Sequence, residues 1–224
     1  MINLKSPLST QIGYGICAFN IFKSLIKDFN QEICYFPIGQ PETSQEYHSL
    51  IQQAINNQEK FETTALSLTI WHENDLFSRI GKGLNCGLSF FELNKFSERT
   101  KRSIICQDIF IVASQWAANI VKEEIPHQHV EVIEMGVDSD LFKPVKLQNQ
   151  DETYRFLNLN KWEIRKGHDI LVEIFNSAFC KEDNVELIMS CNNPFLSEIE
   201  GKKWMDLYKN SLLGEKIKFI PRLQ

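Results

Sequence analysis

Residues 156–175 of the chain read FLNLNKWEIRKGHDILVEIF: a short apolar run, then a cationic turn, then a segment of helical period. The apolar run is typical of a strand, and the apolar spacing from 167 to 179 indicates a helix with one buried face. Lys161, Arg165 and Lys166 lie between the two. A helix N-terminus already carries partial positive charge and disfavours cations, so their position favours a bound anion. A solvated run of charge explains the same residues equally well.

The alternation of apolar runs and helical segments continues in both directions, which is the pattern of a doubly wound α/β fold. We expect strands at residues 2–4, 32–38, 65–71, 88–91, 109–113, 130–134, 154–159, 185–190 and 216–220. We expect helices at residues 16–29, 44–57, 97–103, 114–124, 167–179 and 196–213. A polar stretch at 142–153, FKPVKLQNQDET, interrupts the pattern and predicts a linker. The sequence therefore predicts two domains, at residues 1–145 and 146–224.

Composition argues against several classes of protein. Of the 224 residues, 43% are hydrophobic and 24% are charged, as in ordinary globular domains, and the net charge of -5 argues against a broad nucleic-acid-binding face. Six cysteines without a CxxC pair favour reduced thiols over disulfides, and no zinc-ligand spacing is present. The N-terminus lacks the apolar core of a signal peptide, and no apolar run reaches membrane-spanning length. We therefore expect a cytoplasmic protein, for which peripheral attachment to a membrane stays open.

Two stretches at expected strand ends of the first domain offer polar groups. Gly13-Tyr14-Gly15 stands between a strand and a helix, where glycines let the backbone approach an anion and the helix N-terminus offers N–H groups. Plain turn chemistry is the alternative. The third glycine of the dinucleotide fingerprint is absent, which makes a dehydrogenase the least favoured function. His72 and Glu73 follow the strand at 65–71, at the edge of an open parallel sheet where ligands usually bind.

Three segments, in order along the chain, resemble the family 4 glycosyltransferases, which are retaining enzymes of GT-B fold. Residues 109–116, IFIVASQW, are similar to that family's strand, serine and helix. Residues 132–138, VIEMGVD, resemble its V-I-P-N-G-V-D stretch and continue to FKP at 142–144, and residues 156–175 are similar to its RKG-x-D-x-L segment. The resemblance implies two Rossmann-like domains of GT-B type, the first on the acceptor side and the second binding a nucleotide sugar.

The resemblance also implies a UDP-, GDP- or ADP-sugar donor as the substrate, with no cofactor and no metal, because cations take the place of the metal. By position, Lys161 stands for the family's arginine and Lys166 for its lysine, so both are expected to bind the donor pyrophosphate and to act in catalysis. Lysine supplies a point charge where arginine supplies a two-pronged contact. Arg165 and the glycine loop at 13–15 are expected to add to the phosphate site.

His72 resembles the family's histidine near the reacting sugar and is the third expected catalytic residue, although a hydrogen-bonded structural histidine explains it equally well. Glu73 and Glu92 are the expected acceptor-side residues. Glu92 stands in the run GLSFFE at 87–92, where relatives often carry a histidine. A solvated loop carboxylate is the alternative for Glu73.

The second domain is expected to be incomplete. The family's Glu-x7-Glu motif, whose carboxylates grip the sugar and the ribose, does not appear before Gln224. We therefore expect a retaining glycosyltransferase that acts on a glycan, lipid or polysaccharide acceptor, with a partner chain as one way to complete the domain. Two alternatives stay open: a non-catalytic module that acts as a binding or assembly partner, and a sugar-nucleotide epimerase of the same fold.

Overall fold

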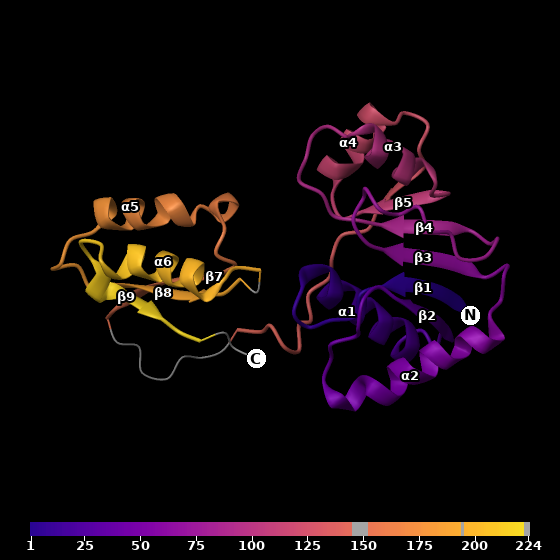
Figure 1. Ribbon diagram of the computed structural model, residues 1–224, viewed down its shortest axis with the longest axis horizontal. Coiled ribbons are helices and arrows are strands. Elements are labelled where there is room, and N and C mark those ends of the chain that lie inside the picture. The colour runs from indigo at the N-terminus through magenta and orange to yellow at the C-terminus, as the bar shows by residue number, and fades with distance from the viewer. Residues whose placement is uncertain (145–151, 194, 222–224) are drawn as a thin grey trace. The chain divides into compact units, whose positions relative to one another are not determined.

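The computed structural model describes residues 1–144, 152–193 and 195–221, and the chain divides into two compact units (Figure 1). The N-terminal unit is Met1–Phe142 and the C-terminal unit is Lys143–Gln224. The domain boundary expected between residues 145 and 146 lies outside the described residues.

The described residues of the N-terminal unit form one sheet of six parallel strands in the order β2-β1-β3-β4-β5-β6. The chain first moves outward from β1 to β2 and then returns across β1 to β3, so the strand order reverses between β1 and β3. Such a reversal is the place where open parallel sheets usually bind ligands, at the carboxyl ends of the strands. The strands are β1 (Ile2–Ser6), β2 (Ile33–Pro37), β3 (Leu66–Ile70), β4 (Asn85–Leu88), β5 (Ile109–Val112) and β6 (Val130–Val132).

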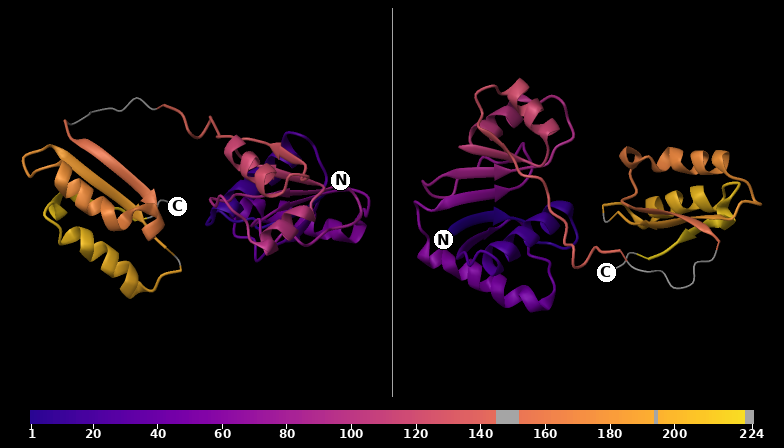
Figure 2. Two further views of the ribbon diagram at one scale, coloured as in Figure 1. Left: turned by 90° about the horizontal axis from the view of Figure 1, so that it is seen from above. Right: turned by 180° about the vertical axis from the view of Figure 1, so that it is seen from behind.

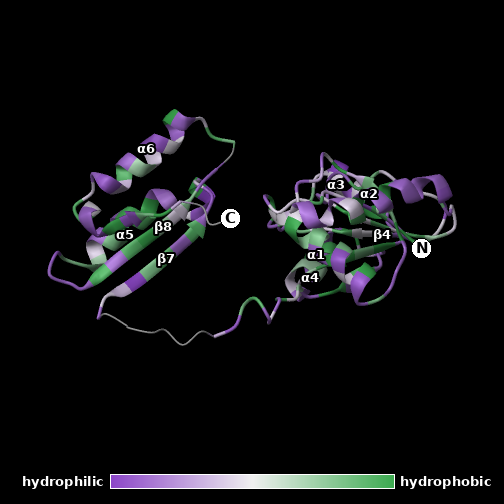
Figure 3. Cartoon of the chain, turned by 90° about the horizontal axis from the view of Figure 1, so that it is seen from below, coloured by the Kyte–Doolittle hydropathy of each residue, from purple (hydrophilic) through white to green (hydrophobic). Residues whose placement is uncertain are grey.

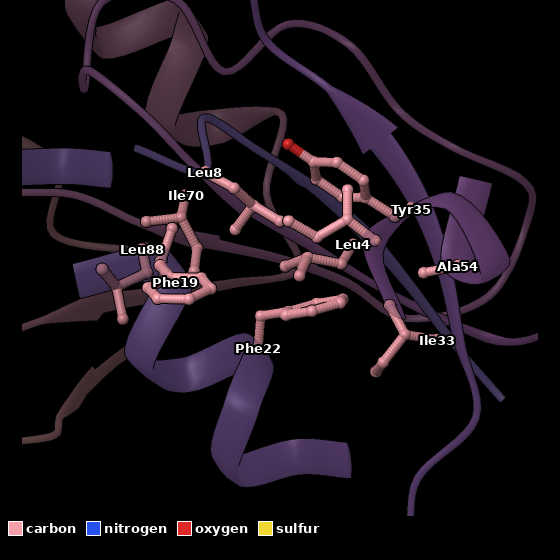
Figure 4. Packing of buried hydrophobic residues seen from close by; sticks show 11 residues of the cluster. Leu4, Leu8, Phe19, Phe22, Ile33, Tyr35, Ala54, Ile70 and Leu88 are labelled. Atoms are coloured by element: carbon pink, nitrogen blue, oxygen red, sulfur yellow. The ribbon is translucent and has the colours of Figure 1, made fainter. Parts of the chain in front are cut away.

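Helices cover this sheet and bury two apolar clusters. The helices are α1 (Gly13–Lys27), α2 (His48–Asn56), α3 (Glu98–Ile105) and α4 (Gln115–Glu124), and in Figure 1 α2 lies beside β2 while α3 and α4 lie beyond β4 and β5. The side chains of Ser97 and Ser114 cap α3 and α4 by accepting backbone N–H groups of the first turn, as the serine before each helix predicts. The first cluster, shown in Figure 4, comprises Leu4, Leu8, Ala18, Phe19, Phe22, Ile33, Tyr35, Ile51, Ala54, Ile70 and Leu88.

The strand expected at residues 88–91 is wrong by three residues, because β4 spans Asn85–Leu88. Asn85 is buried, and its Nδ2 donates to Gln107 Oε1 at 2.9 Å, so a residue type that usually marks a loop is satisfied inside the sheet. Phe90 and Phe91 follow the strand instead of forming it. They therefore lie at the carboxyl edge of the sheet.

Asp108 fixes the start of β4 from the turn before β5. Its Oδ2 accepts the backbone N–H of Asn85 at 2.8 Å and a guanidinium N–H of Arg79 at 3.1 Å. These two donors, the backbone one first, hold the pKa of Asp108 below its usual range.

The described residues of the C-terminal unit form a parallel sheet of three strands in the order β7-β8-β9. The strands are β7 (Tyr154–Asn160), β8 (Val185–Cys191) and β9 (Ile217–Phe219), and the helices are α5 (His168–Ala178) and α6 (Glu198–Lys209). Both helices lie on the same side of the sheet (Figures 1 and 2). Their common core comprises Trp162, Val172, Phe175, Val185, Leu187, Met189, Tyr208, Leu213 and Ile217.

Strand β7 is an edge strand, and much of it is open to solvent. Leu157 is 60% exposed and Leu159 is 55% exposed, whereas alternate residues of β8 are buried under the helices. Figure 3 shows hydrophobic colour along much of β8 and much hydrophilic colour on α6. The prediction of an α/β fold with two Rossmann-like parallel sheets is confirmed by these two units.

In the described part of the chain, no helix combines the length and the apolar character needed to cross a membrane. All six cysteines lie within the described residues, and each is a free thiol.

Candidate functional site

Three loops meet at the carboxyl edge of the N-terminal sheet, because the strands that carry them are parallel and adjacent. Residues 7–12 and the start of α1 follow β1, residues 71–75 follow β3, and residues 89–92 follow β4. The expected acceptor-side and glycine-loop residues all belong to these loops or to the first turn of α1.

Tyr14 connects the three loops. Its hydroxyl accepts the backbone N–H of Phe90 at 2.9 Å, lies 2.8 Å from the carbonyl oxygen of Phe90, and lies 3.0 Å from Ser89 Oγ. Its ring lies 5.6 Å from the ring of Trp71 and 4.6 Å from that of His72, both on the loop after β3. The side chain of Tyr14 therefore faces the loops that follow β3 and β4.

His72, Glu73 and Glu92 are brought together around Tyr14. The exposed His72 ring packs 4.8 Å from Trp71, and the backbone carbonyl of His72 accepts the N–H of Asp75. Burial raises the pKa of Tyr14, and the negative charges of Glu73 and Glu92 add to the rise. The structure thus places both carboxylates within electrostatic range of one phenol, beside a solvent-accessible imidazole.

The two glycines of the 13–15 loop differ in how much space a side chain would have. A Cβ on Gly15 would lie 2.6 Å from the carbonyl oxygen of Ser9, so this glycine allows α1 to approach the loop after β1. A Cβ on Gly13 would meet nothing within 4 Å. Ile12 supplies no side-chain cap to α1, so the first N–H groups of the helix lack an intrahelical or capping partner within the described residues.

The cationic turn of the C-terminal unit joins β7 to α5. Residues Ile164–Lys166 form one turn of 3₁₀ helix that ends at Gly167, whose φ of 74° is the left-handed conformation that glycine adopts without strain. Gly167 is also the N-cap of α5 and offers no side chain to the N–H groups of that helix. Lys166 is therefore held directly before an uncapped helix N-terminus.

The other two cations of the turn have partners. Arg165 Nη2 lies 3.3 Å from Glu163 Oε2, which offsets part of its charge. Lys161 Nζ lies 4.9 Å from the centre of the Phe195 ring, a cation–π distance. Phe195 itself is 76% exposed, so the ammonium of Lys161 stays at the surface of the unit.

Trp162, His168 and Asn193, which sequence reasoning did not assign to the site, organise the turn. The Trp162 ring is buried and stacks on Trp204 at 5.8 Å with an interplanar angle of 7°. Asn193 Nδ2 donates to the backbone carbonyl of Trp162 at 3.0 Å, which ties the turn to the loop after β8. The only signal in the sequence was the position of Trp162 and His168 inside the cationic stretch.

A cavity of about 300 Å³ adjoins the turn, at the low end of the volumes that small ligands occupy. Its wall combines apolar and hydrogen-bonding side chains from the turn, the end of β8 and the first turns of α6. The lining residues are Trp162, Cys191, Asn192, Asn193, Leu196, Ser197, Glu198, Gly201, Lys202 and Met205. Within the described ranges, no group of three or more His, Cys, Asp or Glu side chains is arranged to hold a metal ion.

No protein-family model matches the chain, and no curated protein sequence matches it. Among solved structures, the chain is similar to Anabaena HepE in complex with UDP-glucose, with a TM-score of 0.63 and 13% sequence identity. The similarity covers 100% of this chain and 69% of that one. At this identity the likeness concerns the fold, which both proteins share across the two units described above.

Proposed function

We propose that the chain binds a nucleotide sugar through the cationic turn and transfers the sugar to an acceptor held by the N-terminal unit, as a retaining glycosyltransferase. The observation that supports the proposal is the uncapped N-terminus of α5, with Lys166 directly before it and the backbone carbonyl of Lys161 2.8 Å from His168 Nε2 in the first turn of that helix. A helix N-terminus with adjacent cations is a binding site for phosphate groups. The UDP-glucose bound to the similar HepE structure supports this ligand class.

The chemistry follows from the charges of the turn. Breaking the bond between the anomeric carbon and phosphate leaves negative charge on the diphosphate and develops positive charge on the sugar. Lys161, Lys166 and the N–H groups at the start of α5 would stabilise the leaving diphosphate in the transition state. No divalent metal is needed in this scheme, because the cations of the protein perform the same electrostatic task.

The N-terminal unit would supply the acceptor side. His72 presents an exposed imidazole at the carboxyl end of β3, and Glu73 and Glu92 offer carboxylates that accept hydrogen bonds from sugar hydroxyl groups. Tyr14 holds these loops together through its hydroxyl and its ring contacts. We propose a glycan, lipid or polysaccharide acceptor with a free hydroxyl group.

The binding step is tested by calorimetry of the full chain with UDP, GDP, ADP and UDP-glucose. The variants Lys161→Ala and Lys166→Ala are expected to bind about 10- to 100-fold more weakly, since a hydrogen bond to a charged group contributes about 1.5–3 kcal/mol. Lys181→Ala is the matched control, because Lys181 is exposed in the turn beyond the C-terminal end of α5 and carries the same charge. Absence of nucleotide binding, or equal losses in all three variants, would refute the proposed donor site.

The reaction itself is tested by product analysis with UDP-glucose, with and without a hydroxyl acceptor. Transfer to the acceptor that falls in His72→Ala supports the proposal. An epimerised nucleotide sugar formed without an acceptor would assign the epimerase alternative instead.

A second candidate, a non-catalytic binding or assembly module, is favoured by the uncovered apolar residues Leu157 and Leu159 on β7. Parallel sheets are normally covered on both faces, so this exposure suits a further polypeptide. Sedimentation of the full chain distinguishes the two functions: a monomer that transfers sugar excludes the module, and an obligate complex without transfer supports it.

A further inference from the structure

We propose that His168 is a positioning residue for Lys161, fixing the backbone of the cationic turn so that the Lys161 ammonium is presented to an anionic ligand. His168 was not among the residues expected at the site. The ligand part of the inference rests on the proposed donor site, whereas the placement of the turn does not.

The contact that carries the inference joins the two ends of the turn. His168 Nε2 lies 2.8 Å from the backbone carbonyl oxygen of Lys161, seven residues earlier. A carbonyl oxygen only accepts, so Nε2 carries the hydrogen and the imidazole is the Nε2–H tautomer. The turn between residues 161 and 168 is thereby closed into a loop of fixed span.

The interior around His168 keeps the ring neutral and in place. The residue is fully buried, and its Nδ1 has no hydrogen-bond partner within the described residues. A proton on Nδ1 would leave a buried N–H unsatisfied, and burial accordingly lowers the pKa of His168. In the neutral Nε2–H tautomer the ring has one N–H donor, and this donor is directed at the Lys161 carbonyl oxygen.

Aromatic contacts hold the imidazole in this orientation. Its ring lies 4.8 Å from that of Trp162 and 6.0 Å from that of Trp204. The hydroxyl of Tyr208 donates to the backbone carbonyl of His168 at 2.7 Å, which anchors the start of α5 to α6. These contacts fix the position of the His168 Nε2–H donor, and through it the backbone of Lys161, relative to the core of the C-terminal unit.

A purely space-filling histidine would show the same burial and ring contacts, so the test has to isolate the donor. His168→Phe keeps an aromatic ring and removes the donor, and His168→Gln replaces Nε2–H with an amide N–H. With UDP as the probe and calorimetry on the full chain, we expect about 5- to 30-fold weaker binding for His168→Phe, from the loss of one buried hydrogen bond. We expect His168→Gln to stay within about threefold of the unsubstituted protein, the scatter of an independent substitution.

A double-mutant cycle shows whether His168 acts through Lys161. In a Lys161→Ala background, His168→Phe is expected to cause a smaller loss of UDP affinity than in the unsubstituted protein, because one of the side chains that the fixed turn presents is gone. A space-filling role would give the same fold-loss in both backgrounds. Additive losses, or an equal loss in His168→Gln and His168→Phe, would overturn the inference.

Trypsin gives a readout that needs no ligand. In His168→Phe, cleavage after Lys161, Arg165 and Lys166 is expected to accelerate several-fold relative to cleavage after Lys181, and His168→Gln is expected to restore protection. Unchanged cleavage ratios would reject the positioning of the turn. If the unsubstituted protein binds no UDP, the donor-site proposal and the ligand part of the inference fail, and the cleavage ratios still decide whether His168 fixes the turn.

Discussion

The substitution Tyr14→Phe tests the joint between the loops after β1, β3 and β4. It removes the hydroxyl but keeps the ring contacts with Trp71 and His72, so no cavity forms. The hydroxyl makes three polar contacts at 2.8–3.0 Å, to the N–H and the carbonyl of Phe90 and to Ser89 Oγ. At about 1 kcal/mol net for each hydrogen bond, less where water replaces them at the half-buried rim, the free energy of unfolding should fall by about 2–3 kcal/mol.

The assay is urea unfolding monitored by hydrogen exchange and mass spectrometry, because the exchange of individual peptides measures the stability of the two units separately. The loss should appear in peptides of the N-terminal unit and leave those of the C-terminal unit unchanged. Tyr47→Phe is the control, since the Tyr47 ring packs 4.9 Å from Phe19 and its hydroxyl has no hydrogen-bond partner among the described residues. A loss below about 0.5 kcal/mol for Tyr14→Phe, the level of an ordinary surface substitution, would refute the reasoning.

Three further predictions concern single contacts. Gly15→Ala should destabilise the N-terminal unit by about 1–3 kcal/mol in urea unfolding, because the added Cβ would crowd the Ser9 carbonyl. Gly13→Ala is the control and should be neutral or slightly stabilising, because its Cβ would meet nothing within 4 Å. Equal effects of the two substitutions would contradict the packing argument. Ser197→Ala removes the capping box of α6 and should lower the stability of the C-terminal unit by about 1 kcal/mol, measured by the same exchange assay. The pKa of Asp108 is lowered in the folded state, so the stabilisation that this carboxylate gives is complete above its unfolded pKa, near 4, and is lost as pH falls through the folded pKa. The free energy of unfolding of Asp108→Asn should therefore depend less on pH below about 4 than that of the unsubstituted protein. An unchanged acid dependence would contradict the role assigned to Asp108.

The order of strands and helices follows from periodicity in this chain because each element is long enough to show its own apolar pattern. The strand at Ile109–Val112 and the helix at Gln115–Glu124 are close to their expected bounds, since a serine cap and a proline mark the helix ends. Strand β4 was misplaced because Asn85 reads as a loop residue until its distant partner Gln107 is known. A sequence pattern carries information about residues that are close in the sequence, whereas Asn85 and Gln107 are 22 residues apart.

The candidate site likewise has features that the sequence pattern predicts and features that depend on residues distant in the sequence. Gly167 stands where the backbone must turn left-handed before α5, and the cations of the turn lie where their spacing placed them. The direction of the Tyr14 side chain was not predictable, since its partner Phe90 is 76 residues away. His168 was hidden for another reason: a histidine beside two cations resembles further surface charge, and only the fold shows that it is buried.

The strand orders of the two sheets have a consequence for how the chain acquires its structure. In the C-terminal unit the strands lie side by side in the order in which they are made, with Tyr154 paired to Val185. In the N-terminal unit, β1 is flanked on both sides only after Ile2 pairs with Leu66, across the whole β2 and α2 excursion. Since folding slows as contacts span more of the chain, we expect the first strand to be made early and to stay half-paired while its second neighbour is synthesised. The β1–β3 pairing at the switch point thus joins residues farther apart in the sequence than any other strand pairing in the described part of the N-terminal unit.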